Sequence, residues 1–392
     1  MKAIPAYLFW LAVAVILYTY FLYPMILFFC YALAQLRRDL GYLLVRRDRR
    51  SASFAFDELP GVSFLIPVHN EQQVLADKLA NLRELDYPRD KLQVVFVSDG
   101  STDRTNEILG GLTDPNIETL VLLTRGGKSV ALNHAVARAQ HNILIFSDGS
   151  TLFAPDAVQK LVRHFVDSSV GAVCGALRFR ASVESQQTEG IYWKYESMLR
   201  LMEARLGITL TASGAIYAIR RNAFIPLSPN VILDDFIIPM NVRKCGYRVL
   251  YDPEAVATDV APNTIAGEFA RRVRLAMGSF RAFWDLTRVP LDISTRLAFY
   301  SHKVLRWTVP WFLIVLLVSN LVLANRPFYK IVLLFQLAFY LWAGLGFLFR
   351  ERARRFRFAS LGYFLLAMNL AFLVGFVRSL VSTEKAIWQR SE

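Results

Sequence analysis

Acidic side chains follow three short apolar runs in the first half of the sequence. A carboxylate can take a proton from a hydroxyl group or help to hold a divalent cation. Any one of these acids alone is compatible with a helix cap or a turn. Three of them, each at the end of a run that reads as a buried strand, favour a common site. They are Glu71 after 62–68, Asp99 at the end of 93–99 and Asp148 at the end of 142–148.

Further charged residues with suitable spacing follow in the second half of this region. Asp234 and Asp235 come directly after an apolar run. We expect them on an extended segment, where adjacent side chains point in opposite directions, so that one of the two faces the cleft. Arg271 and Arg274 are spaced to share one face of a helix. A solvated basic face, or attraction to a membrane surface, is the alternative interpretation of these arginines.

A lysine at the start of a predicted helix suggests phosphate binding. Gly126 and Gly127 precede Lys128 after a predicted strand. Backbone N–H groups at a helix N-terminus, with a lysine beside them, favour an anion. A glycine turn with a solvated lysine is the alternative. The sequence contains neither GxGxxG nor GxxxxGK[ST], which excludes the dinucleotide fingerprint and the P-loop.

The elements that must position these residues alternate between strand and helix. Short apolar runs bounded by polar or glycine residues predict strands, and residues with helical spacing separate them. This alternation predicts βαβ units and a parallel sheet, in which ligands bind at the carboxyl ends of the strands. The predicted strands are 62–68, 93–99, 117–123 and 142–148, and the predicted helices include 71–85 and 128–140.

The composition indicates a membrane protein with a sizeable water-facing domain. Of the 392 residues, 54% are apolar and 20% are charged. The 29 Phe, 16 Tyr and 7 Trp can form a large core, which excludes a disordered chain, and three cysteines without CxxC exclude a disulfide scaffold. The net charge is +13; stretch 37–50 (six Arg, two Asp) and stretch 350–357 (five Arg, one Glu) each contribute +4. Both flank apolar segments, as in the positive-inside rule, and this location disfavours nucleic-acid binding.

Apolar runs at both ends of the chain predict four membrane spans. Each approaches or exceeds the roughly 20 residues that a span needs. The basic stretch after the first span is expected in the cytoplasm, with both termini outside. Segment 294–307 mixes basic and aromatic residues, so it can lie flat at the interface or form the cytoplasmic end of the next span. The predicted units are a transmembrane helix (1–36), a basic cytoplasmic linker (37–60), a globular domain (61–292), an interfacial helix (293–308), three transmembrane helices (309–382) and a tail (383–392).

Seven sequence motifs together resemble the membrane-bound family-2 glycosyltransferases, the group of the cellulose, chitin, hyaluronan and poly-N-acetylglucosamine synthases. They are FLIPVHNE, VSDGSTDRT, GGKSVALNHA, FSDGS, SGAIYAIRR, LDDFIIPMNVRKCGYRVLYDPEAVA and RRVRLAMG. The motifs keep the order and spacing of that family over 61–278. The resemblance implies an α/β GT-A domain, with a mostly parallel sheet that binds a nucleotide sugar, beside an α-helical transmembrane bundle. It also implies transfer of the sugar with inversion.

The resemblance assigns a role to each matching residue. Asp235 is the expected general base, with Asp234 and Arg274 also catalytic. Asp148 matches the first acid of the DxD motif, which binds Mg²⁺ or Mn²⁺ on the donor diphosphate. The expected nucleotide-binding residues are Pro67, His69, Glu71, Asp99, Lys128 and Asp148, and the expected acceptor-binding residues are Ser213, Gly214, Arg271 and Leu275.

Two positions depart from the family pattern. The DxD motif reads Asp148-Gly149-Ser150, so its second acid is missing. Leu275 replaces the tryptophan of the Q/RxxRW motif, which lines the acceptor site in relatives that build long polymers. This substitution argues against strong retention of the growing product. A tryptophan from elsewhere is the alternative source of a stacking surface, and the candidates are Trp193, Trp284 and Trp307.

These features together predict an integral-membrane inverting glycosyltransferase. Its cytoplasmic domain would use a UDP-sugar to extend a glycan for extracellular polysaccharide synthesis at the cell membrane, as a homo-oligomer or with export partners. Transfer of a single sugar to a polyprenyl-linked acceptor is the alternative within this class. A catalytically inactive membrane subunit is the alternative outside it, although the intact Asp99, Asp148 and Asp235 argue against that.

Overall fold

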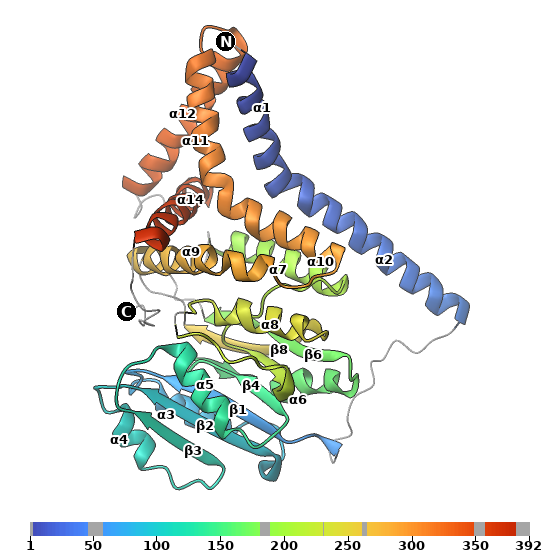
Figure 1. Cartoon of the computed structure of the whole chain (residues 1–392), viewed down its shortest axis with the longest axis vertical. Helices are drawn as coiled ribbons and strands as arrows, with labels where there is room; N and C mark the ends of the chain where they lie inside the picture. Colours follow the sequence, from blue (N-terminus) through green and yellow to red (C-terminus); the bar gives the residue numbers. More distant parts are fainter. Residues whose placement is uncertain are drawn as a thin grey trace.

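The computed structural model describes residues 3–45, 58–180, 189–229, 231–260, 265–348 and 357–381. Helices cluster at one end of the molecule and an α/β domain forms the other (Figure 1). The helices of the α/β half and its short helical turns are α3 (Leu75–Arg83), η3 (Arg89–Lys91), α4 (Thr105–Gly110), α5 (Lys128–Arg138), α6 (Ala157–Val162), η4 (Arg163–Val166), α7 (Glu189–Arg205), η5 (Arg221–Ala223) and α8 (Asp234–Lys244).

Eight strands of the described ranges form one sheet in the order β3-β2-β1-β4-β7-β6-β8-β5. Neighbouring strands are parallel from β3 to β4, and the pairs of β7 with β4 and β6 are antiparallel. The predicted parallel sheet is thus confirmed, with strand boundaries that differ by up to two residues from the prediction. The strands are β1 (Val62–Val68), β2 (Leu92–Asp99), β3 (Ile117–Leu122), β4 (Ile143–Phe146), β5 (Leu152–Phe153), β6 (Val170–Arg180), β7 (Tyr217–Arg220) and β8 (Arg248–Val260).

Alternate residues of the central strand β1 enter two different cores. Phe64 and Ile66 belong to the core that includes Leu75 of α3, while Leu65 packs on the opposite face with Leu132 of α5. All seven residues of β1 are buried, which explains why its sequence is mostly apolar instead of alternating between apolar and polar residues. Helices therefore cover both faces of the sheet and leave its strand ends open for a site.

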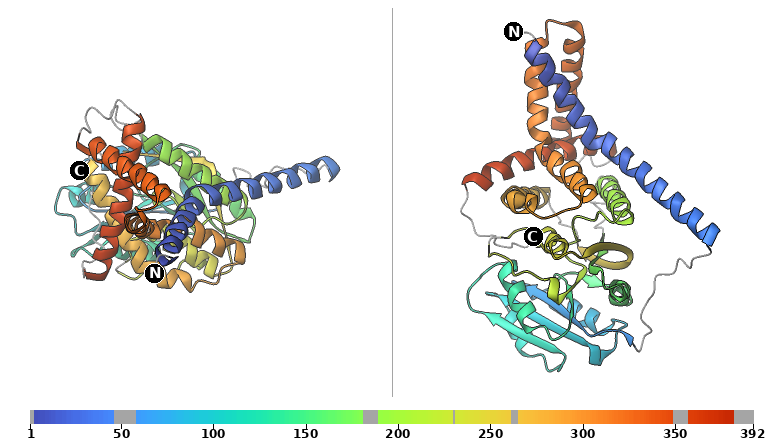
Figure 2. Two further views of the ribbon diagram at one scale, coloured as in Figure 1. Left: turned by 90° about the horizontal axis from the view of Figure 1, so that it is seen from above. Right: turned by 45° about the vertical axis from the view of Figure 1, so that its right-hand side comes forward.

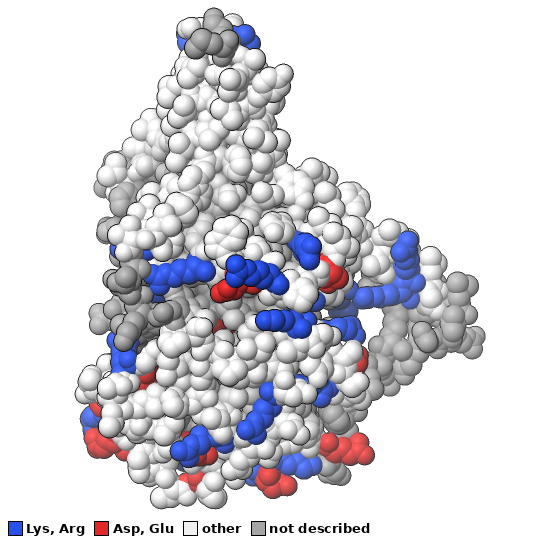
Figure 3. All heavy atoms as spheres, viewed as in Figure 1, with Lys and Arg blue, Asp and Glu red and all other residues white. Residues whose placement is uncertain are grey.

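Among the residues that the structure describes, the helical half contains four segments long and apolar enough to cross a membrane. These candidate spans are Ala3–Gly41, Ile293–Leu323, Pro327–Gly346 and Gly362–Val381. On the face shown in Figure 3, charged side chains are sparse over these helices, and a band of Lys and Arg begins where they meet the α/β domain. The elements are α1 (Ala3–Leu17), η1 (Tyr18–Leu22), α2 (Tyr23–Val45), α9 (Ile265–Thr287), α10 (Ile293–Ala298), η6 (Phe299–Val304), α11 (Leu305–Leu323), α12 (Pro327–Leu348) and α14 (Arg357–Val381).

Two predicted boundaries look different in the structure. Residues 37–45 of the predicted linker continue helix α2, and 46–57 lie outside the described residues. The predicted interfacial segment 293–308 runs without a break through α10 and η6 into α11. In Figure 1, α9 lies across the base of α11 and α12, and Figure 2 also places it between these helices and the sheet. The predicted tail 383–392 also lies outside the described residues.

A group of buried charged side chains joins the α/β domain to the spans; we call it the junction cluster. Glu196 of α7 accepts a hydrogen bond from Arg306 of α11 at 2.6 Å. His302 of η6 lies between two acids, with Nδ1 2.5 Å from Glu203 and Nε2 3.2 Å from Glu196. Lys303 Nζ lies 3.5 Å from Glu196. Every carboxylate in this cluster therefore has a partner, and the cluster is defined by Glu196, Glu203, His302, Lys303 and Arg306.

Candidate active site

The carboxyl ends of the adjacent strands β1, β2 and β4 meet at one edge of the sheet. Glu71 and Asp99 are buried there, and His69 Nδ1 lies 2.7 Å from the backbone oxygen of Asp99. Pro67 is buried within β1. The predicted helix 71–85 begins only at Leu75, because residues 71–74 form a turn closed by the Val74 N–H on the Glu71 oxygen at 3.0 Å.

Asp99 organises the glycine turn that precedes α5. Its two carboxylate oxygens accept hydrogen bonds from the backbone N–H groups of Gly126 and Gly127 at 2.6 and 2.7 Å. The expectation that these N–H groups point at a phosphate is therefore not met in this structure, because an internal carboxylate takes them. Asp99 instead sets the direction in which Lys128, the first residue of α5, leaves the turn.

Glu71 and the DGS motif are in close contact. A Cβ atom on Gly149 would lie 1.7 Å from Glu71 Oε2, so any other residue at this position would displace the Glu71 carboxylate. The motif Asp148-Gly149-Ser150 therefore lies in contact with Glu71, the acid that follows β1. Gly149, the middle residue of the motif, packs closely against the Glu71 side chain, a contact that the sequence does not reveal.

Lys128 connects two acids from distant parts of the chain. Its Nζ lies 2.7 Å from Asp148 Oδ1 and 3.2 Å from Asp234 Oδ2. Burial alone would lower the pKa of the Lys128 ammonium, but the two carboxylates outweigh burial and raise that pKa above its ordinary value. Lys128 is therefore a fixed positive charge between two carboxylates. With Asp235, these three residues form what we call the carboxylate cluster.

The geometry of Asp234 and Asp235 corrects our prediction. They are the first two residues of helix α8, not part of an extended segment, so their side chains diverge by about 100° instead of pointing in opposite directions. Both consequently reach the site: Asp234 pairs with Lys128, while Asp235 lies against Gly214. Burial and the neighbouring charge of Asp234 raise the pKa of Asp235 to about 6. Burial also raises the pKa of Asp234, against the opposing effect of Lys128.

The predicted acceptor-binding residues come from two segments. A Cβ atom on Gly214 would lie 3.3 Å from Asp235 Cβ, and Ser213 beside it is buried. Arg271 and Arg274 lie on α9, as predicted for a shared helix. Burial and the charge of Arg271 lower the pKa of Arg274, while the charges of Asp234, Asp148 and Asp235 act on it in the opposite direction. Arg274 is thus within the electrostatic reach of the whole carboxylate cluster.

Leu275 packs into the apolar cluster at the base of the spans, which also contains Phe236 and Trp307. Trp307 is only 5% exposed, with ring centroids 6.3 Å from Phe236 and 6.2 Å from Phe280. Trp284 is 67% exposed. The side chain of Trp193 lies outside the described residues. Trp307 is buried and Trp284 is largely open to solvent, so neither offers an enclosed ring face to an acceptor. Neither therefore replaces the tryptophan that the family motif has at the position of Leu275.

Three residues near the site were not predicted from the sequence. Lys78 and Asn81 of α3 hydrogen-bond to the segment that carries Asp148. Lys78 follows Leu75 by three residues and so lies on the apolar stripe of the predicted helix, a position that could have marked it. Arg200 of α7 lowers the pKa of Asp235 through its charge, after the larger effects of burial, Asp234 and Lys128. No local pattern marks Arg200.

A metal ion is compatible with this site only together with ligands from a substrate. Within the described ranges, no group of three or more His, Cys, Asp or Glu side chains could hold a metal. Oxygen atoms of Asp148 and Asp234 nevertheless converge on one positive charge, that of Lys128. Hard oxygen donors of this kind suit Mg²⁺ or Mn²⁺, which commonly bind one or two carboxylates plus phosphate oxygens and water.

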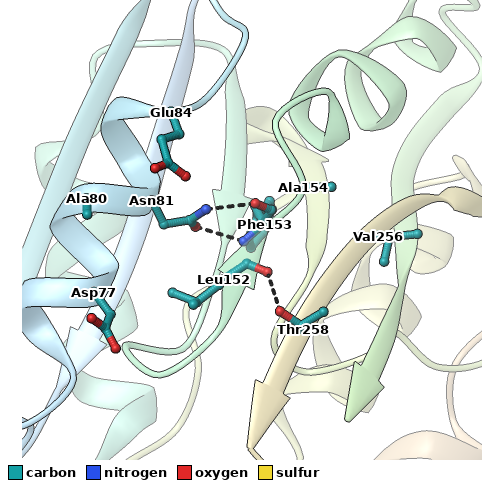
Figure 4. Close-up of a pocket in the computed structure, with 9 residues that line it drawn as sticks. All are labelled: Asp77, Ala80, Asn81, Glu84, Leu152, Phe153, Ala154, Val256 and Thr258. Atoms are coloured by element: carbon teal, nitrogen blue, oxygen red, sulfur yellow. Dashed lines mark hydrogen bonds between the residues drawn. The ribbon is translucent and has the colours of Figure 1, made fainter. Parts of the chain in front are cut away.

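A separate open cleft of about 440 Å³ lies beside α3, between this helix and the strands β5 and β8 (Figure 4). Asp77 of α3 and Glu84, the residue directly after α3, line one side. Leu152 of β5 and Thr258 of β8 line the other. None of the predicted site residues lines this cleft, so it is distinct from the carboxylate cluster.

The mostly parallel sheet, with helices on both faces and with carboxylates and a lysine at the ends of its strands, is a GT-A-like arrangement. Residues 63–227 match the family described as Glycosyl transferase family 2. The chain therefore carries a family-2 glycosyltransferase domain, as the sequence motifs predicted.

Similar proteins agree with this assignment. The chain is 27% identical over 248 residues to a poly-beta-1,6-N-acetyl-D-glucosamine synthase of Staphylococcus aureus, covering 62% of this chain and 59% of that protein. It is 31% identical over 242 residues to an N-acetylglucosaminyltransferase of Mesorhizobium japonicum, covering 57% of this chain and 56% of that protein. The matches thus span less than two thirds of these relatives.

The fold also resembles a solved structure over most of its length. That structure is the mannosyltransferase PcManGT from Pyrobaculum calidifontis in complex with GDP-Man and Mn²⁺. The TM-score is 0.68 at 22% identity, covering 92% of this chain and 99% of the other. At this identity the likeness concerns the fold.

Proposed function

We propose that this protein is a membrane-bound inverting glycosyltransferase that transfers a sugar from a nucleotide donor, a UDP-sugar, to a growing glycan. The observation that carries the proposal is the carboxylate cluster: Asp235, with a pKa raised to about 6, lies beside Asp234, which shares Lys128 with Asp148. A carboxylate with a pKa near neutrality is suited to take a proton at physiological pH. The family-2 domain gives this chemistry its context.

In the proposed reaction, Asp235 takes the proton from a hydroxyl group of the acceptor. The hydroxyl oxygen forms a bond to the anomeric carbon of the donor sugar, and the bond from that carbon to the diphosphate oxygen breaks. Attack from the face opposite the leaving group inverts the configuration. The nucleoside diphosphate leaves with additional negative charge, and the positive charges of Lys128 and Arg274 can stabilise it.

The remaining predicted residues bind the two substrates in this proposal. Glu71, Asp99, His69 and Pro67 surround the nucleoside at the ends of β1 and β2. Asp148, with Asp234 close by, holds Mg²⁺ or Mn²⁺, which when bound neutralises charge on the donor diphosphate. Ser213, Gly214, Arg271 and Leu275 face the acceptor. The Mn²⁺ and GDP-Man bound in the mannosyltransferase structure support a metal and a nucleotide sugar as ligands of this fold.

We assign the protein to the cell membrane as a multi-pass protein with its catalytic domain in the cytoplasm. The four candidate spans support this location. The basic band at the base of the spans also supports it, because positive side chains accumulate on the cytoplasmic side (Figure 3). Donor sugar nucleotides would then reach the site directly. The relative that makes poly-N-acetylglucosamine supports a polysaccharide as the product.

Transfer of one sugar to a lipid-linked acceptor is the second candidate. It is favoured by Leu275, which packs among apolar residues at the base of the spans, and by the burial of Trp307 in the same cluster. A growing polymer needs a surface that holds several sugar rings, and an aromatic face supplies it best. A lipid-linked acceptor is held at the membrane by its own tail.

The deciding experiment supplies purified protein in nanodiscs with a panel of nucleotide sugars. Release of a nucleoside diphosphate is measured, and the product is then sized by gel electrophoresis. We expect release from one UDP-sugar that depends on an added glycan acceptor. Absence of release from every donor, with oligosaccharide and lipid-phosphate acceptors both present, would contradict the proposed function.

A further inference from the structure

Lys78 is a lysine whose side chain is fully buried beneath the loop that carries Asp148. Its Nζ donates a hydrogen bond to Ser147 Oγ at 2.7 Å and another to the backbone oxygen of Thr151 at 2.5 Å. These two acceptors flank the segment Asp148-Gly149-Ser150. In the described part of the chain, no carboxylate forms an ion pair with this amine.

Asn81, one helical turn after Lys78, holds the next part of the same loop. Its Nδ2 donates to the backbone oxygen of Phe153, and the backbone N–H of Phe153 donates to its Oδ1, both at 2.8 Å (Figure 4). Positions three residues apart lie on the same face of a helix. One face of α3 therefore fixes residues 147–153 at two places.

A lysine in this position is costly, which argues that its amine has a use. Removing an ammonium group from water is unfavourable, and an apolar side chain would fill the same space without that desolvation. Burial lowers the pKa of Lys78 to about 7, in spite of the opposing charges of Asp148, Glu71 and Asp259. The rings of Phe64 and Phe153 lie 5.3 and 5.2 Å from Nζ. The amine is thus retained in an otherwise apolar setting, and the hydrogen bonds it makes go to the Asp148 loop.

We propose that Lys78 is a positioning residue that fixes the 147–151 loop through its hydrogen bonds to Ser147 and Thr151. It thereby directs the Asp148 carboxylate toward a divalent cation carried by the donor diphosphate. The inference rests on the proposed function. Ser150 stands where the DxD motif has its second acid, so a metal would find one carboxylate on this loop instead of two. The orientation of that single carboxylate then depends on how rigidly the protein holds the loop.

A purely structural role for Lys78 makes a different prediction. If the lysine only connects α3 to the sheet, its loss lowers the melting temperature but leaves the folded molecules with normal metal affinity. If it directs Asp148, its loss weakens metal binding by the folded molecules. Changes to groups that orient a metal ligand typically cost about 10- to 100-fold in metal affinity.

The test is a Mn²⁺ titration of the full chain in nanodiscs with UDP, and with GDP as a second probe, followed by electron paramagnetic resonance of the free and bound ion. We expect Lys78→Met to weaken Mn²⁺ binding about 10-fold or more relative to wild type. UDP affinity measured without metal should stay unchanged. Lys160→Met is the control, because Lys160 of α6 pairs with Asp156 and not with residues 147–151.

Ser147→Ala covers the case in which Lys78→Met fails to fold. It removes one acceptor of the lysine with little change in volume, and we expect weaker Mn²⁺ binding in the same direction. Mn²⁺ affinity within twofold of wild type in the folded variants, with only a lower melting temperature, would overturn the inference. Absence of Mn²⁺–nucleotide binding by the wild type would instead count against the proposed function, so the two failures are distinguishable.

Discussion

The carboxylate cluster and the junction cluster both bury charged side chains, but they balance those charges differently. In the junction cluster, Glu196 and Glu203 contact His302, and Glu196 also meets Lys303 and Arg306. In the carboxylate cluster, Asp148 and Asp234 share a single lysine, and Asp235 lies beside them.

The difference in balance has a chemical consequence. Burial, together with an excess of negative charge, raises the pKa of a carboxylate, as it does for Asp235 beside Asp234. Groups with such pKa values are suited to exchange a proton or to accept a cation, whereas fully paired groups hold elements together. We therefore expect changes in the carboxylate cluster to alter the reaction, and changes in the junction cluster to alter the stability of the fold.

The largest effect is expected at Asp235. Asp235→Asn removes the proposed base while keeping the shape of the side chain, and loss of a general base typically costs about 10²–10⁴-fold in rate. Binding of UDP should stay nearly intact. The measurement compares the turnover of this variant with that of the control Asp77→Asn. The control changes an acid that lines the cleft beside α3. Residual turnover above about a tenth of wild type would show that Asp235 is not the base.

Removal of the metal ligand should have an effect of similar kind. We expect excess chelator to abolish activity, and Mn²⁺ or Mg²⁺ to restore it. Asp148→Ala should raise the metal concentration needed for half-maximal activity, or eliminate activity, because the proposed site has few other protein ligands. The measurement is nucleoside diphosphate release across a metal titration. Full activity in excess chelator would refute the metal role.

A change in the junction cluster tests the other side of the comparison. Glu196→Ala leaves Arg306 and His302 buried without this carboxylate, and breaking a buried ion pair typically costs about 3–5 kcal/mol. We expect a lower midpoint of thermal unfolding in detergent. Turnover per folded molecule should change much less than in Asp235→Asn. An unchanged midpoint would mean that the network does not contribute to stability.

A smaller effect is expected from Arg200, which lies on α7 between Glu196 and Glu203. Its positive charge lowers the pKa of Asp235, so Arg200→Gln should raise that pKa. Asp235 must be ionised to accept a proton, and the acid limb of the profile of kcat/KM against pH should therefore move to higher pH. Arg205→Gln, on an exposed position of the same helix, is the control. A shift to lower pH in Arg200→Gln would contradict this electrostatic assignment.

The smallest effect concerns product length, and donor chemistry should not change. Leu275→Trp introduces an aromatic face where the family of polymer synthases has one, and we expect longer products at unchanged donor affinity. Gel sizing of products from both forms decides the question. Very long polymer from the wild type, independent of residue 275, would remove Leu275 from the acceptor site.

Local pattern was enough to predict much of the fold. The run 62–68 is apolar except for Ser63 and became β1 with the predicted limits, because a strand buried on both faces favours apolar residues on both. The acids after the strands were also predictable, since parallel strands place their carboxyl ends at one edge. The four apolar helices follow from length and composition alone.

The sequence by itself thus determined the strands, the spans and which residue types gather at the strand ends. Tertiary structure decided how those residues meet. Lys128 pairs with Asp234 across a long stretch of chain, and Asp99 turns toward the glycine loop instead of outward. Asp234 and Asp235 start a helix, which brings both into the site. These outcomes depend on side-chain direction, burial and charges contributed by distant segments, and no local periodicity encodes them.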